Sequence, residues 1–202
     1  GIIETKDLYY FLDAVRLVFR SGELADTEQK QFRQWCREFL DWLLNSPQGR
    51  RVFMSQNNQG TYYDLQVASL AVFLDDIQTL LQILRVSSMR AAQQFQQDGS
   101  QPEELKRTNS LHYCTFNLQG WFNLARIARL AGMDLWNTRT RDGSCPALGL
   151  SWVLSFPQVE WPYQQDSAFD YDRLALLRHL AHPTSGDGST EPGTSTIVQS
   201  EI

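Results

Sequence analysis

The segment Leu65-Gln66-Val67-Ala68-Ser69-Leu70-Ala71-Val72-Phe73-Leu74 is apolar almost all the way round when it is wound as a helix. A helix that is apolar on every side has to be covered on every side, which predicts an inner helix. The segments before it, 8–19 and 32–43, are apolar on one face only, with the i, i+3, i+4, i+7 spacing of helices that lie on a core. The sequence therefore predicts an inner helix with amphipathic helices packed around it.

Helical periodicity continues along the rest of the chain. Further apolar stripes at helical spacing run through 77–84, 111–128, 148–156 and 174–181. Alternating patterns typical of strands are nearly absent, so the predicted fold class is all-α. About seven helices joined by short loops favour stacked helical hairpins, which either close into an α/α toroid or extend as a solenoid.

Length and composition fit one globular domain followed by a tail. The 202 residues are 42% hydrophobic and 20% charged, which excludes wholesale disorder. The 18 Lys and Arg against 23 Asp and Glu give a net charge of -5, which argues against a nucleic-acid partner. Apolar residues become rare after residue 182, so we expect a domain over 1–182 and a disordered tail over 183–202.

Signals for membranes, disulfides and metals are weak. No stretch reaches the roughly 18–20 apolar residues that cross a bilayer, so we expect no membrane insertion. Cys36, Cys114 and Cys145 form no CxxC pair and give no disulfide framework. His179 and His182 are three residues apart, but no Cys or carboxylate accompanies them, so surface positions near a helix end are favoured over a metal site. We expect neither a metal nor a cofactor.

Two polar segments carry the functional signal, and the first is Asn57-Asn58-Gln59-Gly60-Thr61-Tyr62-Tyr63-Asp64. Thr61, with Asp64 three residues later, predicts the N-cap of the following helix. A cap does not account for the three consecutive amide side chains before it. Amide donors beside a helix N-terminus, where free N–H groups and the helix dipole favour anions, form a natural clamp for a carboxylate.

The second segment runs from Asp98 to Tyr113 and reads DGSQPEELKRTNSLHY. Ser100 with Glu103 predicts a capping box on a short helix, and residues 108–110 predict the start of the next helix. Arg107 and Tyr113 lie on either side of that break. A cation beside a phenol favours the phenolate, so Tyr113 is a candidate base, although core packing plus a surface charge explains the pair as well.

At these two segments the chain resembles the alginate lyase domain family of uronate polysaccharide lyases. The family pattern Asn-Asn-His-Gly-Thr-aromatic-Tyr-Asp corresponds to 57–64, and Asp-Gly-Ser-Gln-Pro-x-Glu-Leu-x-Arg-Thr-x-Ser-Leu-His-Tyr corresponds to 98–113. Shorter likenesses at 1–7, 134–137 and 161–164 extend the resemblance over about residues 1–165. Family members are longer and have helices upstream, so the resemblance implies an incomplete α/α toroid, that is, part of an α/α barrel.

The resemblance also implies an activity, which is β-elimination on a 4-linked uronate polymer. By the family pattern Tyr113 acts as base and acid, while Asn58 and Arg107 hold the substrate carboxylate. Substrate-binding roles are implied more weakly for Asn57, Tyr62, His112, Trp136 and Tyr163. Family practice places such enzymes in the periplasm or outside the cell.

Gln59 departs from the family pattern, which has His at this position. Gln can donate an N–H to a carboxylate oxygen, but it cannot carry a proton or act as a base. The replacement predicts that any activity favours syn elimination by Tyr113 alone, on mannuronate or glucuronate units rather than guluronate. Besides a lyase, two other functions stay open: a carbohydrate-binding pseudoenzyme of the same fold, and a helical-repeat interaction module.

Overall fold

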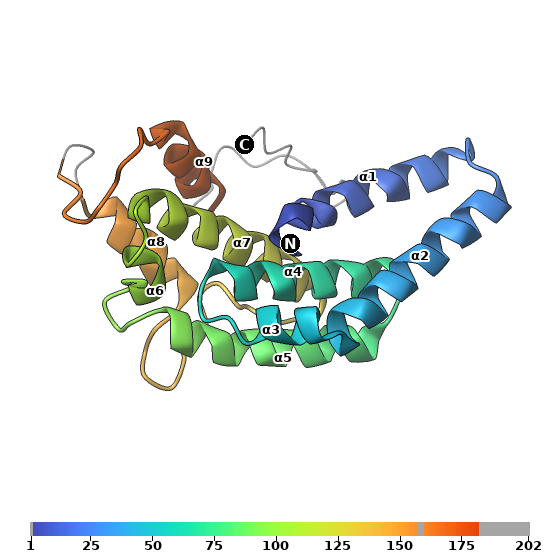
Figure 1. Cartoon of the computed structure of the whole chain (residues 1–202), viewed down its shortest axis with the longest axis horizontal. Coiled ribbons are helices and arrows are strands. Elements are labelled where there is room, and N and C mark those ends of the chain that lie inside the picture. Colours follow the sequence, from blue (N-terminus) through green and yellow to red (C-terminus); the bar gives the residue numbers. More distant parts are fainter. Residues whose placement is uncertain (1, 157–159, 182–202) are drawn as a thin grey trace, which may run out of the picture.

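The computed structural model describes residues 2–156 and 160–181, which form helices joined by loops (Figure 1). A short 3-10 helix, η1 (Ile2–Thr5), precedes α1 (Leu8–Ser21), α2 (Asp26–Asn45), α3 (Pro47–Phe53), α4 (Asn58–Phe73), α5 (Ile77–Gln94), α6 (Pro102–Leu105), α7 (Ser110–Leu130), α8 (Pro146–Leu154) and α9 (Tyr171–Ala181). These two ranges contain no strand, which confirms the all-α fold class. His182 and the tail predicted over 183–202 lie outside the described residues.

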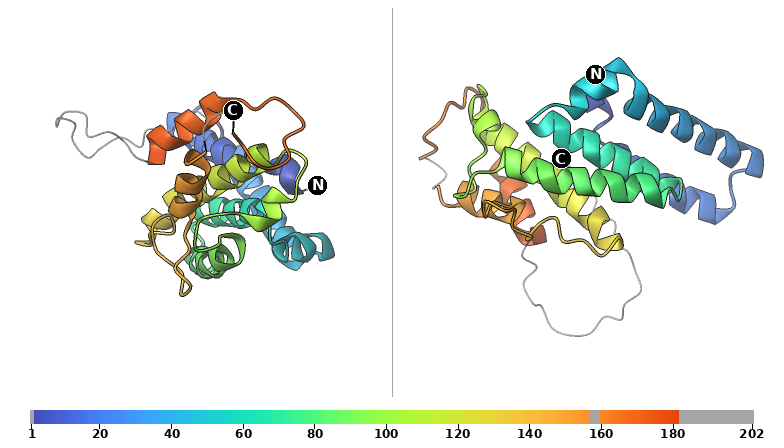
Figure 2. Two further views of the ribbon diagram at one scale, coloured as in Figure 1. Left: turned by 90° about the vertical axis from the view of Figure 1, so that its left-hand side faces the viewer. Right: turned by 90° about the horizontal axis from the view of Figure 1, so that it is seen from below.

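Helix α4 is the centre of the fold, as the apolar segment 65–74 predicted. It packs against α1, α2, α3, α5 and α7, so that it is covered on all sides (Figures 1 and 2). Leu65, Val67 and Leu70 are completely buried, and all but two of the side chains from Asn58 to Phe73 are buried with them. The inner helix is therefore confirmed.

Helix α4 begins earlier than the sequence predicted. Its N-cap is Asn57, whose side-chain Oδ1 accepts the backbone N–H of Gln59 at 3.2 Å. Thr61 lies inside the helix and is fully buried, where its hydroxyl hydrogen-bonds the side chains of Gln94 and Asn117. The prediction that Thr61 caps the helix was wrong because Asn57 already performs that role.

A second predicted cap is also absent. Helix α6 begins at Pro102 with Gln101 at the N-cap position. The backbone N–H of Ser100 donates instead to the carboxylate of Asp98, and Glu103 pairs with Lys106 at the surface. The predicted capping box between Ser100 and Glu103 therefore does not form.

Helix α7 runs close to α4 because a glycine lies at their contact. A Cβ atom on Gly120 would lie 3.0 Å from Cγ2 of Thr61 and 3.1 Å from the ring of Tyr62, which is tighter than normal packing. The absence of a side chain lets the two backbones approach. This contact brings the first half of α7 beside the first turns of α4, where both polar segments of the sequence analysis lie.

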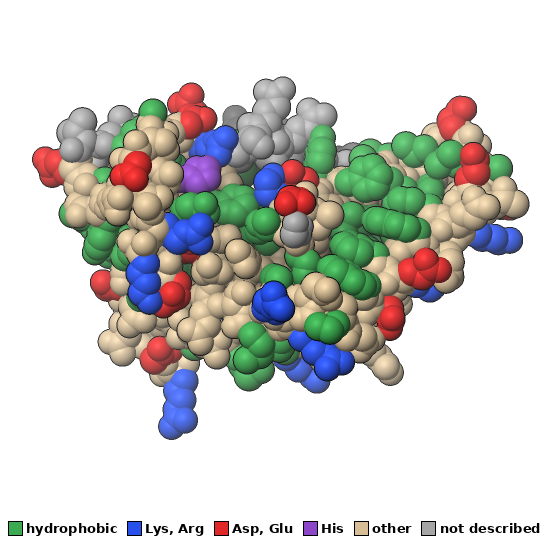
Figure 3. Space-filling model, viewed as in Figure 1, with side chains coloured by type: hydrophobic (Ala, Val, Ile, Leu, Met, Phe, Trp, Pro, Cys, Tyr) green, Lys and Arg blue, Asp and Glu red, His purple; other side chains and the backbone are tan. Residues whose placement is uncertain are grey.

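Hydrophobic side chains gather on an outer face over α1 and α2 (Figure 3). The rings of Phe32, Trp35, Phe39 and Trp42 stack on one another along α2, with neighbouring centroids 5.4–5.9 Å apart. Trp35 and Trp42 are exposed, while Phe32 and Phe39 are partly buried against the core. These four aromatic side chains therefore lie away from the cleft described below.

Candidate active site

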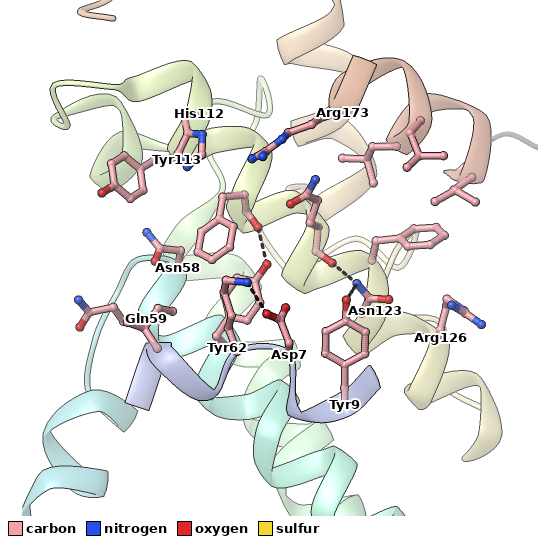
Figure 4. Close-up of a pocket in the computed structure, with 18 of the residues that line it drawn as sticks. Asp7, Tyr9, Asn58, Gln59, Tyr62, His112, Tyr113, Asn123, Arg126 and Arg173 are labelled. Atoms are coloured by element: carbon pink, nitrogen blue, oxygen red, sulfur yellow. Dashed lines mark hydrogen bonds and ion pairs between the residues drawn. The ribbon is translucent and has the colours of Figure 1, made fainter. Parts of the chain in front are cut away.

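A cleft of about 520 Å³ opens where the first turns of α4 meet the first half of α7. The segment from η1 to the start of α1 forms one wall, and α9 forms the opposite wall (Figure 4). Four cationic side chains line the cleft: Lys6, Arg107, Arg126 and Arg173. Asp7 and Glu4 also line it, so its walls carry both signs of charge.

Asn58 is held at the base of the cleft by Glu104. One carboxylate oxygen of Glu104 accepts the backbone N–H of Asn58, and the other accepts the side-chain Nδ2–H at 2.8 Å. Both residues are buried, with exposed fractions of 3% for Asn58 and 1% for Glu104. Because a carboxylate only accepts, it determines which end of the amide faces it, and the second Nδ2–H of Asn58 stays available to a ligand.

Burial raises the pKa of Glu104 above its ordinary value, and the hydrogen bonds from Asn58 oppose that shift. The positive charge of Arg107 also favours the ionised form, while the charge of Glu103 disfavours it. An ionised Glu104 accepts both donors of Asn58, whereas a protonated one has lost acceptor capacity. The orientation of Asn58 therefore depends on the protonation state of a buried neighbour.

The loop before α4 is anchored by a buried ion pair. Arg90 of α5 donates from Nε and Nη2 to the carboxylate of Asp64, at 2.7 and 3.1 Å. Its remaining donors reach the backbone carbonyls of Ser55 at 2.7 Å and Phe53 at 2.9 Å. One guanidinium thus fastens the loop to α4, just ahead of Asn58.

A second buried network, centred on the side-chain amide of Gln94, holds the same loop. Gln94 of α5 donates from Nε2 to the carbonyl of Asn57 at 2.9 Å. Its Oε1 accepts from Asn117 Nδ2 at 3.0 Å and from Trp121 Nε1 at 2.7 Å, which locks the amide in place. Asn117 also donates to the side chain of Gln101 at 2.9 Å, which links α7 to the segment that carries Glu104. These contacts preorganise the two polar segments relative to each other.

Tyr113 and Arg107 lie together in the cleft. The guanidinium carbon of Arg107 lies 4.0 Å from the centroid of the Tyr113 ring, over its face. A cation at this distance from an aromatic face is attracted by the ring quadrupole. Arg107 therefore contacts the ring of Tyr113, and both side chains line the same cleft as Asn58 and Gln59. Figure 4 shows Tyr113, Asn58 and Gln59 on the same side of the cleft.

His112 also lines the cleft, although it directly precedes Tyr113 on α7. The two rings meet edge to face with centroids 5.4 Å apart, and His112 lies parallel to Phe116 at 6.2 Å. Burial lowers the pKa of His112, and the positive charge of Arg173 lowers it further. Neutral imidazole is therefore favoured, with one donor and one acceptor nitrogen.

Tyr62 forms part of the floor. It is buried, its ring stacks on Phe116 with centroids 4.4 Å apart, and its hydroxyl donates to the carbonyl of Phe116 at 3.2 Å. Burial raises the pKa of Tyr62 well above its ordinary value, and the nearby Tyr9 and Asp7 add to the shift. Tyr62 thus keeps its proton and serves as a hydrogen-bonded part of the floor.

The structure does not bring three of the sequence-predicted residues into the cleft. Asn57 is the N-cap of α4 and is not among the lining residues. Trp136 is 3% exposed and packs edge to face on Phe122, so it belongs to the core. Tyr163 is 40% exposed and packs against Trp152 and Trp161, away from the cleft lining.

Sequence reasoning missed other residues of the site. Glu104 lies in the second polar segment, 98–113, but was assigned no role there. Its position three residues before Arg107, a predicted site residue, was the signal that could have identified it. Gln119 and Arg173 also line the cleft, and nothing in their local sequence distinguishes them from surface residues. Arg90 and Gln94 act through the backbone of a loop distant in sequence, which no local pattern reveals.

In the part of the chain that the structure describes, the fold is all-helical and its cleft is lined by amides, cations, carboxylates, a phenol and an imidazole. The family model for alginate lyase matches residues 1–160, and the chain belongs to the alginate lyase family. The resemblance seen in the two motifs is thereby confirmed.

A crystal structure of an alginate lyase from Bacteroides ovatus is similar in fold, with a TM-score of 0.85 and 26% sequence identity. The match covers 90% of this chain and 50% of that one, so the chain spans half the length of its structural relative. No curated protein matches the chain. The structural match confirms the α/α toroid, of which these helices form a part.

Proposed function

We propose that the chain provides the catalytic cleft of a polysaccharide lyase that cleaves a 4-linked uronate polymer by β-elimination. The observation that carries the proposal is the amide of Asn58, held by Glu104 in the cleft that also contains Arg107 and Tyr113. The cleft thus collects a fixed donor, a cation and a candidate base, which are the groups that the reaction needs.

The difficult step is removal of the C5 proton, which lies next to the uronate carboxylate. The anion formed there is an enolate-like dianion unless donors and a cation neutralise the carboxylate. The free Nδ2–H of Asn58 and the guanidinium of Arg107 supply those interactions in this proposal. Because Asn58 is already oriented by Glu104, little reorganisation is required when charge develops.

Tyr113 supplies the proton transfers. Its phenolate oxygen takes the C5 proton, the electron pair forms the C4–C5 double bond, and the C4–O4 bond breaks. The phenol then returns the proton to the departing O4, so that Tyr113 ends as it began. One residue can serve as both base and acid only when the proton and the leaving group lie on the same face of the sugar, which is syn elimination.

Gln59 sets the expected substrate preference. It is exposed, it lines the cleft, and it offers a donor but no proton-accepting nitrogen. Anti elimination, as on guluronate, needs a base on the opposite face from Tyr113. We therefore expect polymannuronate or glucuronan to be cleaved in preference to polyguluronate.

The test follows the ultraviolet absorbance of unsaturated uronate on polymannuronate, polyguluronate and glucuronan. The parent chain is expected to cleave the first or the third, Tyr113→Phe to lose that activity, and Gln59→His to gain activity on polyguluronate. Cleavage of polyguluronate by the parent at equal or higher rate would contradict the proposed preference.

A carbohydrate-binding pseudoenzyme is the second candidate, and Gln59 in place of the family's His is the observation that favours it. This function predicts calorimetric binding of a short oligouronate without turnover. Turnover by the parent chain that disappears in Tyr113→Phe rejects it. If the parent shows no turnover and Gln59→His does, the pseudoenzyme function is supported.

The proposed partner is an acidic polysaccharide, and the proposed location is the periplasm or the cell exterior, both by analogy with the family. Among the described residues, no helix is long and apolar enough to cross a membrane. The exposed apolar surface over α1 and α2 lies outside the cleft lining and has no role in this proposal.

A further inference from the structure

Two buried donor atoms in the cleft have no acceptor among the described residues. They are Nε2 of Gln119 and Nε of Arg173, and both side chains line the cleft. Arg173 Nε forms an ion pair with Oδ2 of Asp170, but their separation of 3.6 Å is beyond hydrogen-bond distance. A buried donor without a partner costs about 1–3 kcal/mol, so two in one cleft point to a ligand that supplies the acceptors.

Arg173 comes from a part of the chain that the family model does not cover. The model ends at residue 160, and Arg173 lies in the first turn of α9 (Tyr171–Ala181). Leu174 and Leu177 are buried and fasten α9 against α7. This packing aims the guanidinium of Arg173 into the cleft, near His112 (Figure 4).

Gln119 lies on the same helix as Tyr113, six residues further on. At 1.5 Å per residue the two positions are about 9 Å apart along the axis of α7. Gln119 is thus offset from Tyr113 along the cleft, where a neighbouring sugar of a bound polymer would lie, and Arg173 lines the same cleft from α9.

We propose that Arg173 and Gln119 form a second carboxylate-binding subsite, which holds the uronate next to the one that reacts at Tyr113. The inference rests on the proposed function, because it assumes a polymer that carries a carboxylate on each sugar. Arg is suited to this role because its planar fork matches two carboxylate oxygens. The lowered pKa of the neighbouring His112 favours its neutral form, so that Arg173 carries the positive charge of this pair.

The subsite is tested by binding and by turnover with Arg173→Gln. Arg178→Gln is the matched control, because Arg178 lies on the same helix, is exposed and does not line the cleft. Calorimetry uses tetramannuronate and, as a neutral probe, a mannose tetrasaccharide, with all proteins carrying Tyr113→Phe so that no cleavage occurs. Mannuronate monomer serves as a third probe, since a single sugar need not reach both subsites.

For tetramannuronate we expect Arg173→Gln to weaken affinity about tenfold, which corresponds to about 1.4 kcal/mol. Its salt dependence should fall as well, because one ionic contact is lost. Arg178→Gln should bind like the parent. Equal weakening for the neutral tetrasaccharide would show that Arg173 does not read a carboxylate, and equal weakening by Arg178→Gln would show a general charge effect; either result overturns the subsite.

Turnover distinguishes failure of the subsite from failure of the proposed function. Without Tyr113→Phe, we expect Arg173→Gln to raise KM on polymannuronate and to change kcat little. If the parent turns over polymannuronate and Arg173→Gln has an unchanged KM, the subsite alone is overturned. If the parent neither cleaves nor binds the polymer, the proposed function is overturned as well. Gln119→Leu, which removes the second donor at similar volume, should weaken binding in the same direction even if Arg173→Gln does not fold.

Discussion

Replacing Glu104 by Gln tests whether a buried carboxylate sets the orientation of Asn58. The parent carboxylate accepts two donors from Asn58, and Gln keeps one carbonyl oxygen but turns the other acceptor into an NH₂ group. A donor of Asn58 then faces another donor inside the protein, at a cost of about 1–3 kcal/mol. If that cost appears as a misplaced amide in the transition state, kcat/KM falls by about 10- to 100-fold, since about 1.4 kcal/mol is a factor of ten.

The pH dependence gives this prediction a distinct signature. Burial raises the pKa of Glu104, so its carboxylate ionises at higher pH in the folded chain than in the unfolded one. Activity requires the ionised form and should rise as pH increases through the raised pKa. Stability should change the opposite way: between the two pKa values the folded chain holds more protons, so this contribution is lost as pH rises. Glu104→Gln should lack both trends.

The assay combines initial rates on polymannuronate with urea unfolding, each across the acid range. Glu103→Gln is the matched control, because its carboxylate pairs with Lys106 at the surface and not with Asn58. We expect that control to keep the parent's maximal rate and an acid limb, which moves to lower pH because the charge of Glu103 no longer disfavours the ionised form of Glu104. If Glu104→Gln keeps the parent's rate and an acid limb, Glu104 does not position Asn58, and the preorganisation argument fails.

Three further predictions concern the scaffold, each measured by urea unfolding. Arg90→Met should destabilise the chain by about 3–5 kcal/mol, because it leaves the buried carboxylate of Asp64 without its partner; the reasoning fails if the loss is below about 1 kcal/mol. Gly120→Ala should cost about 1–3 kcal/mol, because the new methyl group would press on the ring of Tyr62; unchanged stability would mean that the helices separate freely. Asp76→Ala should cost about 1 kcal/mol by removing the N-cap of α5, and since hydrogen bonds lower the pKa of Asp76, the parent should lose this contribution as pH falls through that pKa; a pH-independent difference would contradict it.

The helical architecture could be predicted from the sequence because burial leaves a periodic trace. The segment 65–74 is apolar on every side, and it is covered on every side. Helix starts were harder, because several residues in one stretch can serve as caps. Thr61 and Asn57 are both good N-caps by type, and only the packing of Thr61 against Gln94 shows which of them ends up inside the helix.

Part of the site could likewise be predicted from local motifs, and part could not. Asn58, Gln59, Arg107 and Tyr113 lie in one cleft, as their motifs suggested. The aromatic residues were harder to place, because a Trp serves a core or a groove equally well, and Trp136 lies in the core. Arg90 and Gln94 hold a loop that is more than 30 residues away in the sequence, and such contacts leave no local sequence pattern.

The cost of burying Glu104 bears on the choice between a lyase and a pseudoenzyme. An ionised carboxylate at 1% exposure with no cation within ion-pair distance among the described residues lowers stability, since its two hydrogen bonds only partly offset desolvation. A chain that needed only to cap the backbone of Asn58 could do so with a neutral acceptor at lower cost. What the charge adds is a fixed amide, with one N–H aimed away from Glu104 and available in the cleft. A weak sugar-binding site gains little from such a donor, whereas a site that must stabilise a developing dianion gains about 2.7–4 kcal/mol from one well-placed hydrogen bond. Glu104 therefore favours the lyase, and Glu104→Gln in the turnover assay is the direct test of that argument.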